Sequence, residues 1–146
     1  MEIIEASAEY LDAIAELEIR AFAVPWSKKT FESAFAADTV SFFAAVEDGA
    51  LLGYACLMAV PPEGELMNIA VDDAYRGRGI GSALMEAVLE KASALGTESV
   101  YLEVRESNAP ARHLYEKYGF SVIGRRRNYY RKPVEDAILM AAGLNA

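Results

Sequence analysis

A glycine-rich segment between a predicted strand and a predicted helix constrains this chain more than any other feature. The segment is Arg76-Gly77-Arg78-Gly79-Ile80-Gly81-Ser82, and it follows the apolar run Glu65–Val71. After it, apolar residues recur at helical spacing at Ile80, Leu84, Val88, Ala92 and Leu95. Glycine lets a backbone approach a ligand closely, and the first N–H groups of a helix lack partners within the helix. Together with the helix dipole, these groups predict a binding site for an anion such as pyrophosphate.

Two other phosphate-binding motifs fit this segment less well. A P-loop requires Gly-Lys followed by Ser or Thr, and the segment contains no lysine. A dinucleotide fingerprint on Gly77 and Gly79 would need a third glycine where Ser82 stands, although Glu103 lies near the position of a ribose-binding acid. A Rossmann domain would also begin at this loop and continue with more strand–helix units than follow here. A flexible loop that only caps a core helix stays open as the alternative.

Hydrophobic periodicity divides the rest of the chain into about seven strands and four helices. The predicted strands are Met1–Ala6, Thr39–Glu47, Ala50–Val60, Glu65–Val71, Ser99–Val104, Phe120–Arg127 and Asp136–Leu144. The predicted helices are a stretch that Ser7 opens, a short helix after an N-cap at Ser27, the helix from Ile80 that Gly96 ends, and Ala109–Tyr118 after an N-cap at Asn108. This order predicts a mixed α/β sheet, with a parallel, right-handed crossover between Glu65 and Val104.

Composition limits the classes of function. A chain of 146 residues fits one domain, residues 1–146, and its 53% hydrophobic and 25% charged residues are ordinary for a globular protein. A net charge of -8 argues against nucleic acid as a main partner. No apolar run approaches the roughly 18 residues of a membrane span, and the first residues lack the pattern of a signal peptide, so we expect a cytoplasmic protein without a membrane partner. One cysteine, Cys56, and one histidine, His113, predict no metal site.

The glycine-rich segment resembles the acetyl-CoA motif of GNAT N-acetyltransferases, Arg/Gln-x-x-Gly-x-Gly/Ala, at every fixed position. Further segments resemble the bacterial RimI family of N-terminal-alanine acetyltransferases, and the similarity covers nearly the whole chain. These segments are Pro25-Trp26-Ser27, Asn68-Ile69-Ala70-Val71, Leu102-Glu103-Val104-Arg105, Asn108, Leu114-Tyr115-Glu116, Gly119-Phe120, Arg126-Arg127-Asn128-Tyr129-Tyr130 and Glu135-Asp136-Ala137. The resemblance implies the GNAT acyl-CoA N-acyltransferase fold and transfer of acetyl from acetyl-CoA to the N-terminal alanine of small-subunit ribosomal protein eighteen.

The resemblance also implies roles for particular residues. The backbone of Ile69, Ala70 and Val71 is expected to bind the pantetheine arm and thioester. The pyrophosphate falls to the motif residues Arg76, Gly77, Arg78, Gly79, Ile80, Gly81 and Ser82, and Asn108 is expected to contact the CoA arm. Glu103 matches the general base and Tyr115 the general acid of the family, with no metal and no covalent cysteine intermediate.

The chemistry of these residues is consistent with such roles. A carboxylate can take the proton of an amine, and a tyrosine can protonate a leaving thiolate. On the strand Ser99–Val104, Glu103 lies on the face opposite the apolar residues, and Asn108 and Tyr115 are two helical turns apart. A solvated carboxylate and a half-buried core tyrosine remain the plainer alternatives. Two other functions also stay open: acetylation of a lysine side chain, polyamine or small metabolite, and a non-catalytic acyl-CoA-binding module.

Overall fold

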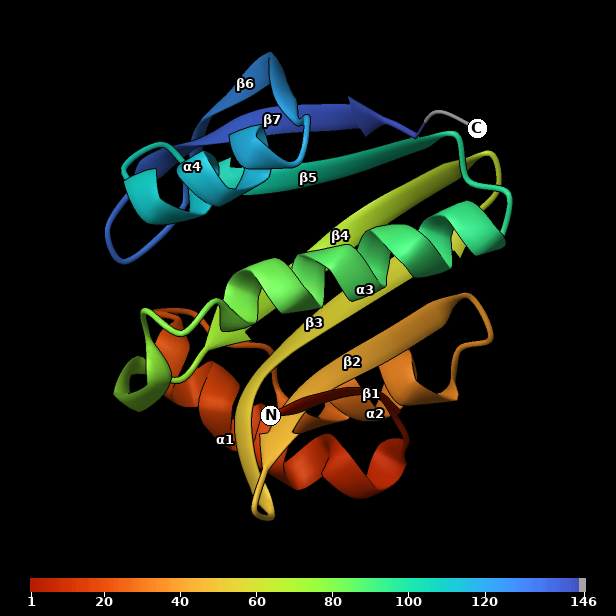
Figure 1. Ribbon diagram of the computed structural model, residues 1–146. Coiled ribbons are helices and arrows are strands. Elements are labelled where there is room, and N and C mark those ends of the chain that lie inside the picture. Colours follow the sequence, from red (N-terminus) through yellow and green to blue (C-terminus); the bar gives the residue numbers. More distant parts are fainter. Residues whose placement is uncertain (145–146) are drawn as a thin grey trace.

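The computed structural model describes residues 1–144 and contains a seven-stranded mixed sheet with helices on both faces (Figure 1). The strands are β1 (Glu2–Ala6), β2 (Val40–Glu47), β3 (Ala50–Val60), β4 (Glu63–Val71), β5 (Ser99–Arg105), β6 (Ser121–Tyr130) and β7 (Glu135–Gly143). The α-helices are α1 (Leu11–Ala21), α2 (Lys28–Ala36), α3 (Ile80–Ala94) and α4 (Ala109–Lys117), with 3-10 turns η1 (Ala8–Tyr10) and η2 (Asp73–Tyr75). The predicted mixed α/β fold is confirmed. Within residues 1–144, none of the helices has the length and apolar character to cross a bilayer.

The sheet order is β1-β2-β3-β4-β5-β7-β6, and its one parallel pair is β4 with β5, as far as residues 1–144 show. Strands β1 to β4 pair antiparallel in chain order, and the Asp48-Gly49 turn joins β2 to β3 as the sequence predicted. The connection from β4 to β5 runs through α3, which is the predicted crossover. Strand β7 then inserts between β5 and β6, so the last two strands form a hairpin at one edge of the sheet.

The sheet opens between β4 and β5, and this opening positions the site. The two strands pair only where residues 63–65 meet residues 99–101, and Figure 1 shows them diverging from there. Strand β4 also carries a bulge: Asn68 lies opposite Cys56, whereas Leu66 lies opposite Leu57, which leaves Met67 without a counterpart. Bulges bend a strand and redirect its backbone groups, and they are frequent beside active sites.

Each face of the sheet is covered by its own apolar core. On one face α3 buries four residues that the helical spacing identified, Ile80, Leu84, Val88 and Ala92, together with Met85, whereas the predicted Leu95 lies exposed after the helix ends. On the other face α1 packs through Leu11, Ile14 and Leu17, and α2 packs through Phe31. Gly53 lets α3 lie close to the sheet, because a Cβ there would stand 3.2 Å from Cδ1 of Leu84 and 3.3 Å from Cγ2 of Ile80.

Three element boundaries differ from the prediction by two residues or more. The stretch that Ser7 was expected to open as an α-helix begins as the 3-10 turn η1, and the α-helix starts at Leu11. Strand β4 begins at Glu63 rather than Glu65, because the turn is confined to Pro61 and Pro62. Strand β6 runs to Tyr130 rather than Arg127, because it continues through a bulge and pairs again with Glu135.

Candidate active site

The glycine-rich loop has the backbone that an anion site requires. Gly77 and Gly79 have φ values of +80° and +77°, in the left-handed region, and Gly79 is the N-cap of α3. A Cβ at either glycine would meet nothing within 4 Å, so conformation rather than crowding favours glycine there. The first helical hydrogen bond runs from the N–H of Ala83 to Gly79, at 3.0 Å. The N–H groups of residues 80–82 precede it and are the ones that a helix leaves for an external acceptor.

The two arginines of the loop are already paired with carboxylates. Nε of Arg76 lies 2.6 Å from Asp73, and Nη2 of Arg78 lies 3.0 and 2.9 Å from the two oxygens of Glu47. Hydrogen bonding to Arg78, followed by the N-terminal ammonium of Met1, lowers the pKa of Glu47. The positive charge of the two arginines is therefore partly offset by these carboxylates, and the N–H groups of residues 80–82 are the groups of this loop that remain available to an anion.

A lysine joins this region from α4, and the sequence did not indicate it. Nζ of Lys117 donates to Oγ of Ser82 at 3.1 Å, and the hydroxyl of Tyr118 donates to the carbonyl of Ser82 at 3.3 Å. These contacts join the start of α3 to the end of α4. They bring a cation beside the candidate phosphate loop across 35 residues of sequence.

Residues 69–71 present one free strand edge. On one side they pair with residues 53–55 of β3. On the other side the pairing of β4 with β5 ends at Glu65, so this edge has no strand partner in the described part of the chain. An extended ligand can bind such an edge as an added strand would. The geometry therefore supports the predicted role of Ile69, Ala70 and Val71 with the pantetheine arm.

Asn108 and Tyr115 lie on α4 in different surroundings. Oδ1 of Asn108 accepts from the N–H of Ala111 at 3.2 Å, which confirms the predicted N-cap and leaves Nδ2 for a ligand. Tyr115 is buried and packs against Phe120, with ring centroids 5.9 Å apart. Burial, followed by the neighbouring Tyr130, raises the pKa of Tyr115 above its ordinary range. Tyr115 therefore keeps its proton at neutral pH, as a general acid must.

Glu103 lines a cavity of about 150 Å³ formed by residues of β5, β6 and β7 together with Glu65, the last residue of β4 that pairs with β5. The lining residues are Glu65, Tyr101, Leu102, Glu103, Ile123, Arg126, Leu139 and Met140. Oε1 of Glu103 lies 3.7 Å from Nε of Arg126, and the Glu103 side chain is 28% exposed. Burial and the charge of Glu103 raise the pKa of Glu65, which the sequence did not single out. The cavity thus offers carboxylates to a cationic group.

Tyr130 connects the two candidate catalytic residues electrostatically. Burial, and then the charge of Glu103, raises the pKa of Tyr130 to about 12. Tyr130 in turn contributes to the raised pKa of Tyr115. Tyr130 is therefore coupled electrostatically to both Glu103 on β5 and Tyr115 on α4.

The structure also contains a buried carboxylate beside β4, Glu18, which the sequence did not indicate. Glu18 is 1% exposed, and its oxygens accept from the N–H of Trp26 at 2.9 Å, from Nδ2 of Asn68 at 3.2 and 3.3 Å, and from the hydroxyl of Tyr54. Burial raises the pKa of Glu18 despite these hydrogen bonds. The cluster joins α1, the α1–α2 connection, β3 and β4. In the sequence Glu18 looks like any other helical glutamate.

Among residues 1–144, the side chains that could bind a metal are not clustered, and the thiol of Cys56 is unreactive. No three or more His, Cys, Asp or Glu side chains there gather to hold a metal ion. Cys56 is buried in β3, and burial raises the pKa of its thiol to about 12. The thiol is therefore protonated at neutral pH and is a poor nucleophile.

Comparison with known proteins agrees with this geometry. The chain matches the Acetyltransferase (GNAT) family over residues 11–120. The [Ribosomal protein bS18]-alanine N-acetyltransferase of Escherichia coli strain K12 is 41% identical over 133 residues, which cover 90% of this chain and 89% of that protein. The Haemophilus influenzae enzyme of the same name is 36% identical over 136 residues, which cover 91% of this chain and 92% of that protein.

A solved structure extends the agreement to three dimensions. The crystal structure of the ribosomal-protein-S18-alanine N-acetyltransferase from Escherichia coli matches with a TM-score of 0.93 and 38% identity, covering 99% of this chain and 94% of that chain. The chain belongs to the GNAT acetyltransferase family and is an acetyl-CoA-dependent N-acetyltransferase.

Proposed function

We propose that this enzyme transfers acetyl from acetyl-CoA directly to the N-terminal alanine of ribosomal protein bS18. The names of its relatives support this acceptor. The observations that carry the chemistry are that the carboxylate of Glu103 lines a cavity and that Tyr115 is buried and retains its proton. A net charge of -8 also favours long-range attraction of a basic acceptor.

The proposed reaction begins with deprotonation of the acceptor. An N-terminal amine has an ordinary pKa of roughly 7.7–8.0, so much of it is protonated at neutral pH. The carboxylate of Glu103 takes this proton, directly or through water, and the freed nitrogen attacks the thioester carbon. Backbone N–H groups of residues 69–71 stabilise the resulting oxyanion.

Collapse of the tetrahedral intermediate completes the transfer. The C–S bond breaks, the nitrogen loses its second proton to solvent to give the amide, and the CoA sulfur receives a proton from Tyr115, which regains one from solvent. Arg76, Gly77, Arg78, Gly79, Ile80, Gly81 and Ser82 hold the donor pyrophosphate in this scheme. Nδ2 of Asn108 contacts the CoA arm. We further propose that residues 1–146 act as one domain and that the reaction takes place in the cytoplasm, where ribosomal proteins are made.

The test is release of free CoA with a panel of acceptors. A peptide with the bS18 N-terminus should react fastest, and the same peptide with its α-amine blocked should not react. Reaction of the blocked peptide at a lysine, or faster reaction of a polyamine, would assign the acceptor class differently. Binding of acetyl-CoA without CoA release for any amine would favour a non-catalytic module.

A further inference from the structure

Arg105, at the end of β5, ties the β6–β7 hairpin to the candidate site. Its Nη1 donates to the carbonyl of Pro133 at 3.0 Å and to Oε1 of Glu135 at 3.2 Å, and its Nη2 donates to the carbonyl of Arg131 at 2.6 Å. The fork of a guanidinium can satisfy several acceptors at fixed angles, which an ammonium cannot do. One side chain therefore holds both sides of the turn between β6 and β7.

The turn that Arg105 holds contains an unfavourable backbone conformation. Lys132 has a φ of +54°, in the left-handed region that side chains with a Cβ seldom adopt. The two carbonyls bound by Arg105 belong to the residues immediately before and after it. Such conformations persist where the surroundings over-determine them. The contacts of Arg105 supply that constraint.

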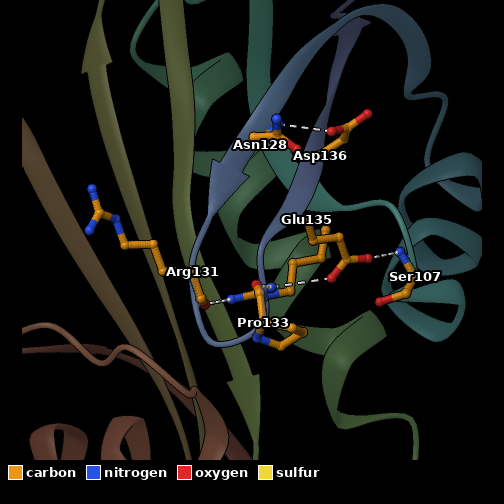
Figure 2. Close-up of polar contacts among 7 residues, drawn as sticks. Ser107, Asn128, Arg131, Pro133, Glu135 and Asp136 are labelled. Carbon is orange, nitrogen blue, oxygen red and sulfur yellow. Dashed lines mark hydrogen bonds and ion pairs between the residues drawn. The ribbon is translucent and has the colours of Figure 1, made fainter.

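The same arginine also organises neighbouring parts of the site. Its guanidinium carbon lies 4.6 Å from the centroid of the Tyr130 ring, which shares the environment of Glu103 and Tyr115. Its partner Glu135 accepts from the N–H of Ser107, just before Asn108, and Figure 2 shows Glu135 directed toward Ser107 in the loop between β5 and α4. The Arg105 and Glu135 side chains are 23% and 14% exposed, so this pair is shielded more than a surface ion pair.

The hairpin that Arg105 restrains forms part of the wall of the Glu103 cavity. Ile123 and Arg126 of β6, with Leu139 and Met140 of β7, line that cavity. Hydrogen bonding to Glu103 is also the first cause that raises the pKa of Tyr129, one residue before Tyr130. Most candidate donor groups are elsewhere, on β4 and at the start of α3, and Arg105 reaches the remaining one, Asn108, only through Glu135 and Ser107. Displacement of the hairpin should therefore alter the acceptor side more than the donor side.

We propose that Arg105 is a positioning residue for the acceptor: it holds the turn at residues 131–134 and Tyr130 so that the hairpin forms the acceptor wall. This inference rests on the proposed N-terminal acetyltransferase function. Arg105 touches no reacting atom in this scheme. Its contribution is to keep the α-amine of the acceptor in line with Glu103 and the thioester.

The test compares two charge-conserving variants of the full chain. Arg105→Lys keeps the positive charge but loses the fork, so we expect the KM for the bS18 peptide to rise about tenfold. The Kd for acetyl-CoA should stay within about twofold, since the candidate contacts on β4 and α3 are untouched and Glu135 can still accept from Ser107. The control is Arg125→Lys on the same hairpin, where Arg125 forms ion pairs with Glu106 and Asp136 that a lysine can retain. Arg125→Lys should leave both constants within about twofold.

Hydrogen exchange of residues 130–135 gives a readout that needs no acceptor. These amides should exchange faster in Arg105→Lys than in the wild type or in Arg125→Lys. Unchanged exchange would overturn the positioning role, and so would an equal loss of affinity for acetyl-CoA and peptide. If the wild type transfers acetyl to no peptide, the proposed function fails, whereas the exchange comparison still decides whether Arg105 holds the hairpin.

Discussion

Nη2 of Arg78 lies 2.9 Å from Oε2 of Glu47, so a residue of the candidate phosphate loop is paired with a carboxylate. Glu47→Gln removes a negative charge close to the site proposed for the pyrophosphate. We expect this variant to bind acetyl-CoA about two- to fivefold more tightly at low salt, with a smaller gain at high salt because screening weakens the interaction. Titration calorimetry at two ionic strengths measures this. Weaker binding would show instead that Glu47 holds Arg78 in its binding position.

The left-handed backbone of Gly79 should matter for both stability and donor binding. Gly79→Ala places a Cβ at a φ of +77°, which costs about 1–2 kcal/mol of folding free energy, and it should raise the Kd for acetyl-CoA at least about tenfold. Gly96→Ala is the matched control, because Gly96 has a φ of +87° at the other end of α3. The control should lose similar stability and keep its affinity. Equal affinity loss in both variants would argue against an anion site at Gly79.

Removal of the Tyr115 hydroxyl tests the general acid. Tyr115→Phe keeps the ring packed against Phe120, so the fold and the affinity for acetyl-CoA should change little. Turnover should fall about 100-fold, within the range of general acid catalysis. Tyr10→Phe, which removes a hydroxyl from the opposite face of the sheet, serves as the control in the same steady-state assay. Near-normal turnover of Tyr115→Phe would refute the assignment.

Replacement of Glu103 should produce a loss that depends on pH. Glu103→Gln should reduce kcat/KM for the peptide about 100- to 1,000-fold at pH 7. The ratio of wild type to variant should shrink toward pH 9, because the N-terminal amine then loses its proton without a base. The exposed Glu98→Gln is the control. A ratio that stays constant from pH 7 to 9 would contradict the role of Glu103 as a base.

The buried Glu18 should make stability depend on pH. Burial raises its pKa, so the folded protein binds this proton more tightly than the unfolded chain does. The resulting stabilisation is complete below the ordinary pKa of glutamate and is lost as the pH rises through the raised pKa of the folded state. Relative to Glu18→Gln, the wild type should therefore gain free energy of unfolding as the pH falls from 7 to 4.5.

Urea unfolding at several pH values measures this difference. The control is Val88→Ala, which removes buried volume from α3 without removing a titrating group. The difference between wild type and Val88→Ala should not vary with pH. A Glu18→Gln difference that is equally flat would show that protonation of Glu18 is not coupled to folding.

Local patterns in the sequence were sufficient for most elements and for the candidate donor site. Hydrophobic spacing identified the buried face of α3, and Ser27 and Asn108 were recognised as N-caps that the structure shows accepting from Thr30 and Ala111. The glycine-rich loop was likewise identified from its own residues and from the strand and helix that flank it. These features depend on residues within a few positions of one another, so their physical causes are present in any short stretch of the chain.

Only the tertiary structure decided which distant side chains meet. Glu18 contacts Tyr54 and Asn68, which lie 36 and 50 residues away, and Arg105 reaches Arg131 across 26 residues. The bulges in β4 and β6 likewise depend on the partner strand and not on the strand's own residues. The burial, hydrogen bonding and pKa of these side chains depend on residues that are distant in the sequence and meet only in the folded chain. A pattern among neighbouring residues therefore cannot predict them.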